Sequence, residues 1–309
     1  MSFYMGNSCQ PARADMQRLT RAYLFVLLIA LQGFVMAQPV LKPILVAEAD
    51  AGLSQPHDAA FSPDGKLIYV TDMANSRIVV LDAISLKMLG SFGKGELSYP
   101  HDAEFDRNGR LLVADTGNNR IAIYEVEDAR ARLVSELTGL SGPEGVAVAP
   151  DGRIIVTNTR SGTLAVFKEG KLETTLGGYG SRPGEFANPH DVDVAPDGSI
   201  HVVDSGNNRL QVIDASLKPL PSVSLTLKLS GPKYLTFDRE RLWLADEYNH
   251  RILLLDHHHA LKGVLGTSTR GRSENAFYKP EAVMARGDLV WVIDTYNDRI
   301  VLLKITNLP

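Results

Sequence analysis

The sequence predicts an all-β protein, a six-bladed β-propeller of four-stranded antiparallel blades, on the basis of three observations. Six segments of similar sequence follow one another at a spacing of about 45 residues, which indicates a repeat architecture. Each segment holds short runs of alternating apolar and polar residues between tight turns, a pattern typical of antiparallel strands. The chain has 309 residues and is 44% hydrophobic, which is enough to bury a sizeable core.

The first 37 residues precede the repeats and differ from them in composition. Arg13, Arg18 and Arg21 lie before an apolar run over residues 22–31, and Ala37 is a small residue at a suitable cleavage point. A basic region, a short apolar core and such a residue are typical of a secretory signal. We therefore expect an exported protein, periplasmic or extracellular, with residues 38–309 as a single domain. The alternative is an uncleaved amino-terminal anchor that holds this domain at a membrane.

The six repeats follow one another without a linker. They begin at LSQPHDAAF, LSYPHDAEF, LSGPEGVAV, FANPHDVDV, LSGPKYLTF and AFYKPEAVM. Turns such as Pro63-Asp64-Gly65 and Pro196-Asp197-Gly198 separate the first two strands of a repeat, because these residues accept tight-turn dihedrals. The sixth repeat stops after its third strand. Residues 43–50, PILVAEAD, are therefore expected to supply the outer strand of the last blade, which closes the ring and removes an exposed edge.

An Asp-x-x-Asn-x-Arg loop recurs in five of the six repeats. Its Asp and Arg residues are Asp72 with Arg77, Asp115 with Arg120, Asp204 with Arg209, Asp246 with Arg251 and Asp294 with Arg299. A catalytic pair need not occur five times. Each aspartate is therefore expected to cap its loop and to pair with the arginine, a charge-assisted bond that fixes blade geometry. The third repeat departs from the pattern, with Asn158 and Thr163 at these positions.

With these motifs the chain resembles the NHL-repeat family over essentially all of residues 38–309. The segment PHDVDVAPDGSIHVVDSGNNRLQVID, residues 189–214, carries the hallmarks most fully. The resemblance implies a six-bladed propeller. It implies little about activity, because this architecture is shared by enzymes, sensors and scaffolds.

The residue that follows the proline of each repeat begins the innermost strand and is expected to lie near the central channel. This residue is polar or ionisable in every repeat. The six versions are His57, His101, Glu144, His190, Lys233 and Glu281. Convergent polar groups in a cavity are typical of a ligand site, so the channel is the predicted site.

Alternate blades of a six-bladed ring approximate a three-fold set, which would bring His101, His190 and Glu281 toward one point. Two neutral imidazoles and a carboxylate suit an open site for zinc or another divalent metal. The alternative is a hydrated polar plug, in which the histidines bond to water, to the aspartates that follow them or to each other. The sequence leaves both interpretations open.

Among NHL enzymes, the pattern looks most like the peptidyl-hydroxyglycine amidating lyase, whose zinc is held by histidines of Pro-His motifs. The resemblance implies His57, His101 and His190 as metal ligands. These residues come from blades one, two and four, which is not an alternating set. Either one histidine is not a ligand, or Glu281 takes its place.

The same resemblance implies a tyrosine base two residues beyond a strand-ending aspartate. Tyr248 and Tyr296 have this offset and are the candidate catalytic residues. The arginine that the lyase carries directly after that aspartate has no match in this chain. The corresponding positions hold Met73, Thr116, Thr159, Ser205, Glu247 and Thr295.

The remaining histidines are expected to have no special role. The tract His257-His258-His259 follows the third strand of the fifth repeat, where a solvated turn is predicted. His201 falls within a strand and His250 within a loop.

The leading interpretation is an exported propeller that binds a peptide, a protein or a small molecule at its channel face, with a divalent metal at the centre as a further option. The variable connectors over residues 177–189 and 266–280 are the predicted recognition loops. A metal-dependent lyase is the alternative. The formal net charge of −4 argues against a nucleic-acid partner. The only cysteine, Cys9, lies before the repeats, so no thiol chemistry is expected in the domain.

Overall fold

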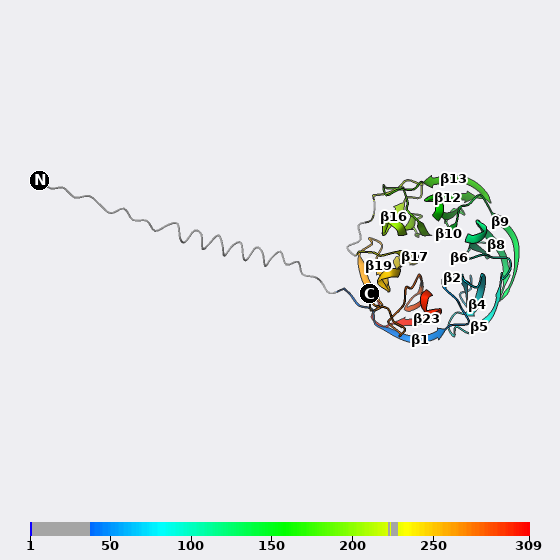
Figure 1. Ribbon diagram of the computed structural model, residues 1–309, viewed down its shortest axis with the longest axis horizontal. Coiled ribbons are helices and arrows are strands. Elements are labelled where there is room, and N and C mark those ends of the chain that lie inside the picture. The colour runs from blue at the N-terminus through cyan, green and yellow to red at the C-terminus, as the bar shows by residue number, and fades with distance from the viewer. Residues whose placement is uncertain (2–37, 222, 224–227) are drawn as a thin grey trace. The chain divides into compact units, whose positions relative to one another are not determined.

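The computed structural model describes residues 1, 38–221, 223 and 228–309. Residues 39–309 form one compact unit, in which six antiparallel sheets surround a central channel (Figure 1). This confirms the predicted propeller. The predicted signal or anchor over residues 1–37 lies outside the described residues, apart from Met1. No helix of the described part is long and apolar enough to span a membrane.

The blades follow the order of the repeats. Blade one contains β2 (Pro56–Phe61), β3 (Leu67–Asp72), β4 (Arg77–Asp82) and β5 (Met88–Phe92). Blade two contains β6 (Pro100–Phe105), β7 (Arg110–Asp115), β8 (Arg120–Glu127) and β9 (Arg130–Leu137), and blade three β10 (Pro143–Val148), β11 (Ile154–Asn158), β12 (Thr163–Lys168) and β13 (Lys171–Gly177). Blade four shows β14 (Pro189–Val194), β15 (Ile200–Asp204) and β16 (Arg209–Ile213) in its described part, and blade five β17 (Pro232–Asp238), β18 (Arg241–Asp246), β19 (Arg251–Leu255) and β20 (Leu261–Leu265).

Blade six joins the two ends of the domain. It contains β21 (Ala282–Arg286), β22 (Leu289–Asp294), β23 (Arg299–Ile305) and, outermost, β1 (Pro43–Ala49). β1 pairs antiparallel with β23, from Pro43 opposite Ile305 to Ala49 opposite Ile300. The predicted closure of the last blade by residues 43–50 is thus confirmed. Because this strand is paired, the ring leaves no free edge between β23 and solvent.

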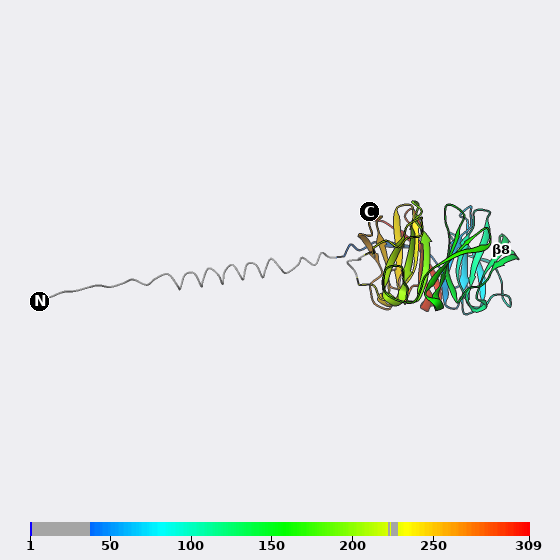
Figure 2. The ribbon, with the colours of Figure 1, turned by 90° about the horizontal axis from the view of Figure 1, so that it is seen from above.

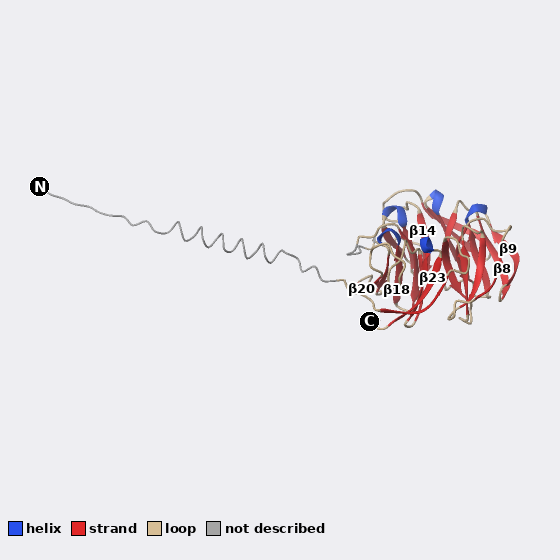
Figure 3. Ribbon diagram, turned by 60° about the horizontal axis from the view of Figure 1, so that its bottom comes forward, coloured by secondary structure: helices blue, strands red, loops and turns tan. Residues whose placement is uncertain are grey.

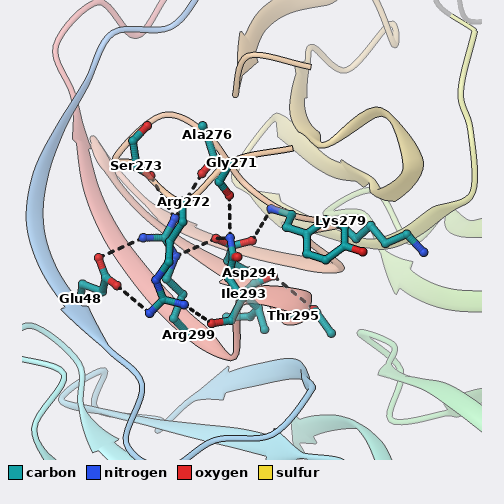
Figure 4. A network of polar contacts seen from close by, with 12 residues as sticks. Glu48, Gly271, Arg272, Ser273, Ala276, Lys279, Ile293, Asp294, Thr295 and Arg299 are labelled. Carbon is teal, nitrogen blue, oxygen red and sulfur yellow. Dashed lines mark hydrogen bonds and ion pairs between the residues drawn. The ribbon is translucent and has the colours of Figure 1, made fainter. Parts of the chain in front are cut away.

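Polar contacts reinforce this closure. The guanidinium of Arg299 donates to Glu48 of β1 at 3.0 Å and, through Nε, to Asp294 at 2.7 Å. Arg272 also donates to Glu48, at 3.3 Å. Figure 4 shows Glu48 held between the two arginines. The amino-terminal strand is therefore fastened to blade six by side chains as well as by its backbone ladder.

The Asp-x-x-Asn-x-Arg loops form one repeated structural device. In each of the five copies the arginine Nε donates to the aspartate Oδ2 at 2.6–2.8 Å, as predicted. The aspartate Oδ2 also accepts the side-chain N–H of the loop's asparagine in every copy, which holds the loop as predicted. In the four copies that continue into a 3-10 turn, the aspartate does not cap the backbone of that turn. Its Oδ1 accepts a backbone N–H from the segment that leads into the innermost strand of the same blade. In blade two, for example, Asp115 accepts the N–H of Ser98, two residues before the first proline of β6. The side chain thus fastens the entry of the innermost strand to the end of the second strand.

The two faces of the ring differ in their connections. Short 3-10 turns after the second strands gather on one face (Figure 3). They are η1 (Thr116–Asn118), η2 (Thr159–Ser161), η3 (Ser205–Asn207), η4 (Glu247–Asn249) and η5 (Thr295–Asn297). The innermost strands begin on the same face, because the proline at the start of β6 lies opposite Asp115, directly before η1. Seen edge-on, the strands run from this face to the hairpin turns on the other (Figure 2).

Apolar side chains fill the space between neighbouring blades. Large buried residues such as Trp243, Trp291 and Phe277 lie in clusters that combine strands of two adjacent sheets. The channel is lined differently. Its walls are the innermost strands, which carry a polar residue directly after their first proline, so the apolar core forms a ring around a polar centre.

Candidate functional site at the channel mouth

A bulge at the start of the innermost strands sets the direction of the predicted site residues. The register between first and second strands shifts directly after the proline in blades one to five, for example between Pro56 and Ala59. A bulge leaves residues unpaired and can re-aim a side chain. The residue after each proline is therefore released from the regular ladder at the channel mouth, the opening on the face that carries the 3-10 turns.

His57 and His101 have the same ring orientation. The Nδ1 atom of each lies 2.9–3.0 Å from the backbone carbonyl two residues earlier, Gln55 O for His57 and Tyr99 O for His101. A neutral imidazole must donate from Nδ1 to satisfy this contact, which leaves Nε2 with a lone pair. The two rings meet edge to face with centroids 4.6 Å apart. Burial lowers the pKa of His57 to about 4 and that of His101 to about 3, so both rings are neutral at physiological pH.

Two histidines of the mouth face a carboxyl group from the neighbouring blade. His57 Nε2 lies 3.3 Å from Glu281 Oε2, and His190 Nε2 lies 3.4 Å from Glu144 Oε2. Burial raises the pKa of both glutamates to about 7 and lowers that of His190 well below its usual range. Since His57 Nε2 carries a lone pair, a protonated Glu281 is the natural donor in its pair. Near neutral pH both carboxyls are therefore protonated to a much greater extent than an exposed glutamate.

Lysines and tyrosines extend the site on the side of blades five and six. The carboxylate of Glu247, at the start of η4, lies 3.7 Å from Lys233 Nζ and 3.3 Å from Lys279 Nζ. Lys279 Nζ also lies over the rings of Tyr248 and Tyr296, at 4.4 and 4.5 Å from their centroids. One buried carboxylate therefore pairs with two lysines, and one of them, Lys279, lies against two aromatic faces.

The predicted tyrosines both lie at the channel mouth. Tyr248 is 54% exposed and lines a cavity at the mouth, whereas Tyr296 packs edge to face against Tyr278. Burial, followed by the nearby Glu281 carboxyl, raises the pKa of Tyr296. A raised pKa disfavours the phenolate that a base would need. The catalytic role of these tyrosines stays a prediction.

A cavity of about 590 Å³ opens beside these groups. Its lining combines site residues with small polar side chains of the 3-10 turns and of the segments before the prolines. It comprises Glu144, Thr159, Asn188, His190, Ser205, Gly206, Asn208, Ser230, Gly231, Lys233 and Tyr248. Such a lining suits a polar ligand that makes several hydrogen bonds and lays one face against an aromatic ring.

Below the mouth, a second layer of carboxyl groups fills the channel. The aspartates that follow the histidines face each other rather than the imidazoles, with the side chains of Asp58 and Asp102 hydrogen bonded. Asp102 accepts the backbone N–H of Val146, and Asp191 accepts that of Leu235 at 2.8 Å. Burial raises the pKa of all three aspartates. These groups tie adjacent innermost strands together.

The predicted metal ligands surround the mouth but are divided into contacts between neighbouring blades. His57 pairs with Glu281, His190 pairs with Glu144, and the rings of His101 and His190 are 6.3 Å apart. Among the described residues, no three His, Cys, Asp or Glu side chains are grouped so that they could hold a metal ion. A metal at this position would have to draw the side chains together and displace the proton of Glu281.

Sequence reasoning missed two charged residues of the site, Glu247 and Lys279. Glu247 follows directly on the strand-ending Asp246, where the other blades have Met, Thr or Ser. This acidic exception was the available signal. Lys279 lies just before the proline of blade six, where Gln, Tyr, Gly or Asn stands in the other blades. Only the folded ring shows that the two meet with Lys233.

Comparison with known proteins agrees with the fold. The NHL repeat matches residues 97–124, 140–167 and 186–213, which lie in blades two, three and four. No curated protein matches the chain at the sequence level. The comparisons give no specific support to the resemblance to the peptidyl-hydroxyglycine amidating lyase.

Solved structures with the same architecture share little sequence with this chain. A catalytically inactive histidine-to-alanine variant of virginiamycin B lyase from Staphylococcus aureus with quinupristin superposes with a TM-score of 0.60 and 16% identity, over 81% of this chain and 80% of that one. An auxiliary nutrient binding protein from Bacteroides ovatus ATCC 8483 has a TM-score of 0.65 and 15% identity, over 82% of this chain and 70% of that one. At these identities the likeness shows the fold alone.

Proposed function

We propose that this six-bladed NHL-repeat propeller is an exported binding protein that takes a small polar ligand at the mouth of its channel. The observation that carries the proposal is the cavity of about 590 Å³ in which His190, Glu144 and Lys233 converge with hydroxyl and amide side chains. Side chains from blades three, four and five contribute, so the site forms only where these blades pack side by side. A solved propeller named as a nutrient binding protein supports a binding role for this architecture.

The charges of the site indicate the chemistry of the ligand. Neighbouring carboxylates raise the pKa of Lys233 despite its burial, and they do the same for Lys279, so both are cationic. Among the described residues, Glu247 is the carboxylate within 4 Å of both lysine Nζ atoms, and the two lysines share it. Glu144 and Glu281 are partly protonated near pH 7. The mouth therefore favours a ligand with a carboxylate or another small anionic group for Lys233 and a flat or apolar face for Tyr248.

The predicted recognition loops have the right location for such a site. The first leaves the end of β13 at Gly177, opposite Thr163, and returns to the channel at Pro189. Arg209 anchors it through the carbonyls of Ser181 and Glu185. The exposed Tyr179 lies in this loop. We expect these loops to add specificity around a site whose charged base is the channel mouth.

A thermal-shift screen of sugars, amino acids, carboxylates and short peptides on the full chain tests the proposal, followed by calorimetric titration of each hit. We expect Lys233→Met and Tyr248→Ala to weaken binding of a hit about ten-fold or more, the loss of one charged hydrogen bond or one aromatic contact. Lys171→Met, on the exposed outer strand of blade three, is the matched control. Equal affinities for the parent and all three variants would place the ligand elsewhere.

A metal-dependent lyase is the second candidate function, and one observation favours it. His57 and His101 each donate Nδ1–H to a backbone carbonyl, the second contact that metal-binding histidines commonly make, and this frees Nε2 for a ligand role. Glu281 offers a buried oxygen beside His57. These residues, with His190, would hold zinc or another divalent cation, which would supply Lewis-acid polarisation of a substrate oxygen.

Elemental analysis separates the two candidates. The protein is purified without chelators, beside a His57→Ala/His101→Ala variant whose folding is checked by circular dichroism. Stoichiometric metal in the parent that is lost in the variant would support the lyase. Detection of glyoxylate release from an α-hydroxyglycine peptide would then test its specific form. A parent protein that retains no metal after reconstitution and desalting would exclude the metal-dependent lyase and leave ligand binding as the remaining candidate.

A further inference from the structure

Two histidines from different blades meet on the face of the ring opposite the channel mouth. His201 lies near the start of β15 in blade four, and His259 ends the turn between β19 and β20 in blade five. Their Nε2 atoms are 3.0 Å apart, and their ring centroids are 5.2 Å apart. His201 is buried and His259 is half-buried. The predicted solvated turn is correct for His257 and His258, which are exposed, but not for His259.

The boundary between blades three and four shows which side chains suffice for packing at the place where His201 and His259 meet between blades four and five. The turn over residues 214–218 has the same backbone hydrogen bonds as the turn over residues 256–260, so Leu217 corresponds to His259. Ile155 corresponds to His201, because Ile154 and Ile200 occupy the same register opposite the end of the innermost strand. Ile155 and Leu217 belong to one apolar cluster. An aliphatic contact therefore suffices at this place in the ring.

Replacing that contact with two imidazoles has an energetic cost. Burial lowers the pKa of His201 to about 4, and burial also lowers that of His259, so both rings are neutral at physiological pH. Only one proton can lie between two Nε2 atoms at this distance, so the pair makes a single hydrogen bond. Phe237 packs edge to face on the His201 ring at 4.9 Å, which keeps water from that side. Burying two polar rings in place of aliphatic side chains lowers stability. Such a cost is expected where the pair serves another role.

We propose that His201 and His259 form a binding site for a divalent transition-metal ion, such as Zn²⁺ or Ni²⁺, between blades four and five. Imidazole nitrogens bind such ions at about 2.0–2.1 Å, which sets the two nitrogens of a right-angled or tetrahedral pair roughly 2.9–3.4 Å apart. The observed 3.0 Å falls in this range. With ring centroids 5.2 Å apart the two rings point nearly at each other, so a bound ion displaces the shared proton and both side chains turn toward it on the side of the cavity.

The surroundings suit an ion with open coordination positions. The histidines line a cavity of about 410 Å³, which Asp197, Asp256 and Glu240 also line. Asp256 is held in place by Lys262 at 3.0 Å and by the backbone N–H groups of its turn. The cavity leaves room for water or a small exchangeable ligand on the metal. This site is separate from the channel mouth, since it lies at the other end of the strands.

Calorimetric titration of the untagged, chelator-stripped full chain with Zn²⁺ alone tests the proposal. The pair variant His201→Ile/His259→Leu copies the side chains of the preceding boundary, and the control His257→Ala/His258→Ala removes the adjacent exposed histidines. We expect the parent and the control to bind one equivalent more than the pair variant, with any channel ion common to all three. Co²⁺ should give visible ligand-field bands from this site in the parent and in the control, and these bands should be absent from the pair variant.

The thermal midpoint keeps the test independent of folding defects. Without metal, the pair variant should unfold at a higher temperature than the parent, because aliphatic side chains replace buried imidazoles. Zn²⁺ should raise the midpoint of the parent more than that of the pair variant. Should the pair variant not fold, His259→Gln removes one ligand with less change in packing. Equal Zn²⁺ stoichiometry in the parent and a folded variant, or loss of the extra equivalent in the control, would overturn the proposal.

Discussion

Arg299→Met tests the account of how the ring is closed. The Arg299 side chain is 1% exposed, and it contacts Asp294, Glu48 and the carbonyls of Ser273 and Ala276. Methionine keeps much of the apolar stem but leaves the fully buried Asp294 without its cation. Removing one partner of a buried ion pair costs about 3–5 kcal/mol in the free energy of unfolding. We expect a loss in that range, because the substitution also frees Glu48 of β1.

The same substitution in blade one provides the matched comparison. Arg77 is 18% exposed, and its polar contacts within the described part of the chain are to Asp72 and to the carbonyl of Gly52. Water can reach this position and replace part of the lost interaction, so Arg77→Met should cost about 2 kcal/mol. Urea-induced unfolding followed by circular dichroism measures both variants. A cost for Arg299→Met no larger than that for Arg77→Met would refute the reasoning that burial and closure set the magnitude.

Three further predictions concern the channel. Burial raises the pKa of Glu281 from 4.5 to about 7, so its contribution to stability is fully present below about pH 4.5 and is lost as the pH rises through 7. With a chelator present, the free energy of unfolding of Glu281→Gln should therefore rise relative to that of the parent between pH 5 and 8, toward a difference of about 3 kcal/mol. Urea unfolding at each pH measures this, and the exposed control Glu173→Gln should match the parent throughout. A difference between Glu281→Gln and the parent that stays constant with pH would contradict the prediction. Gly145→Ala places a Cβ 2.7 Å from the Asp191 Cα and should lower the free energy of unfolding by about 1–3 kcal/mol, and an unchanged urea midpoint would show that the strands can separate there. Tyr234→Phe removes a buried hydroxyl that donates to a backbone carbonyl of blade two and should cost about 1 kcal/mol, measured by the same unfolding curve, with no loss pointing to a water in its place.

The architecture could be predicted from the sequence because the same pattern of strands and turns occurs six times along the chain. Each repeat carries its own turn and its own strand pattern, and five of the six carry the Asp–Arg pair, so a weak signal in one copy is supported by the others. The missing strand of the sixth repeat pointed directly to residues 43–50. These features depend on local sequence and on the requirement that the ring close. Neither needs knowledge of how side chains point.

The candidate site was predictable only in its location. The residues after the prolines do lie at the channel mouth, but they form contacts between neighbouring blades instead of an alternating set of three. His57 contacts Glu281, and His190 contacts Glu144. Each histidine lies at a bulge, where the side chain is released from the regular alternation of the strand and can point toward the neighbouring blade. Sequence spacing assigns a residue to a blade and not to a side-chain direction.

Long-range pairs were beyond the reach of sequence reasoning for a related reason. The contact between Lys279 and Glu247 joins residues of different blades, as does the contact between His201 and His259. Nothing in the spacing of such residues shows that they meet. What was visible was an exception to the repeat, an ionisable residue at a position that other blades fill with a neutral one. Such exceptions are where the function of a repeat protein is to be sought.

The most direct test of the central claim is a crystal structure of the protein with a ligand identified by the screen. We predict ligand density in the cavity between blades three and five, with an anionic group within hydrogen-bond distance of Lys233 Nζ and a face against the Tyr248 ring. A ligand bound on the opposite face, or on the outer strands with the channel mouth unchanged, would contradict the assignment of the channel mouth as the functional site.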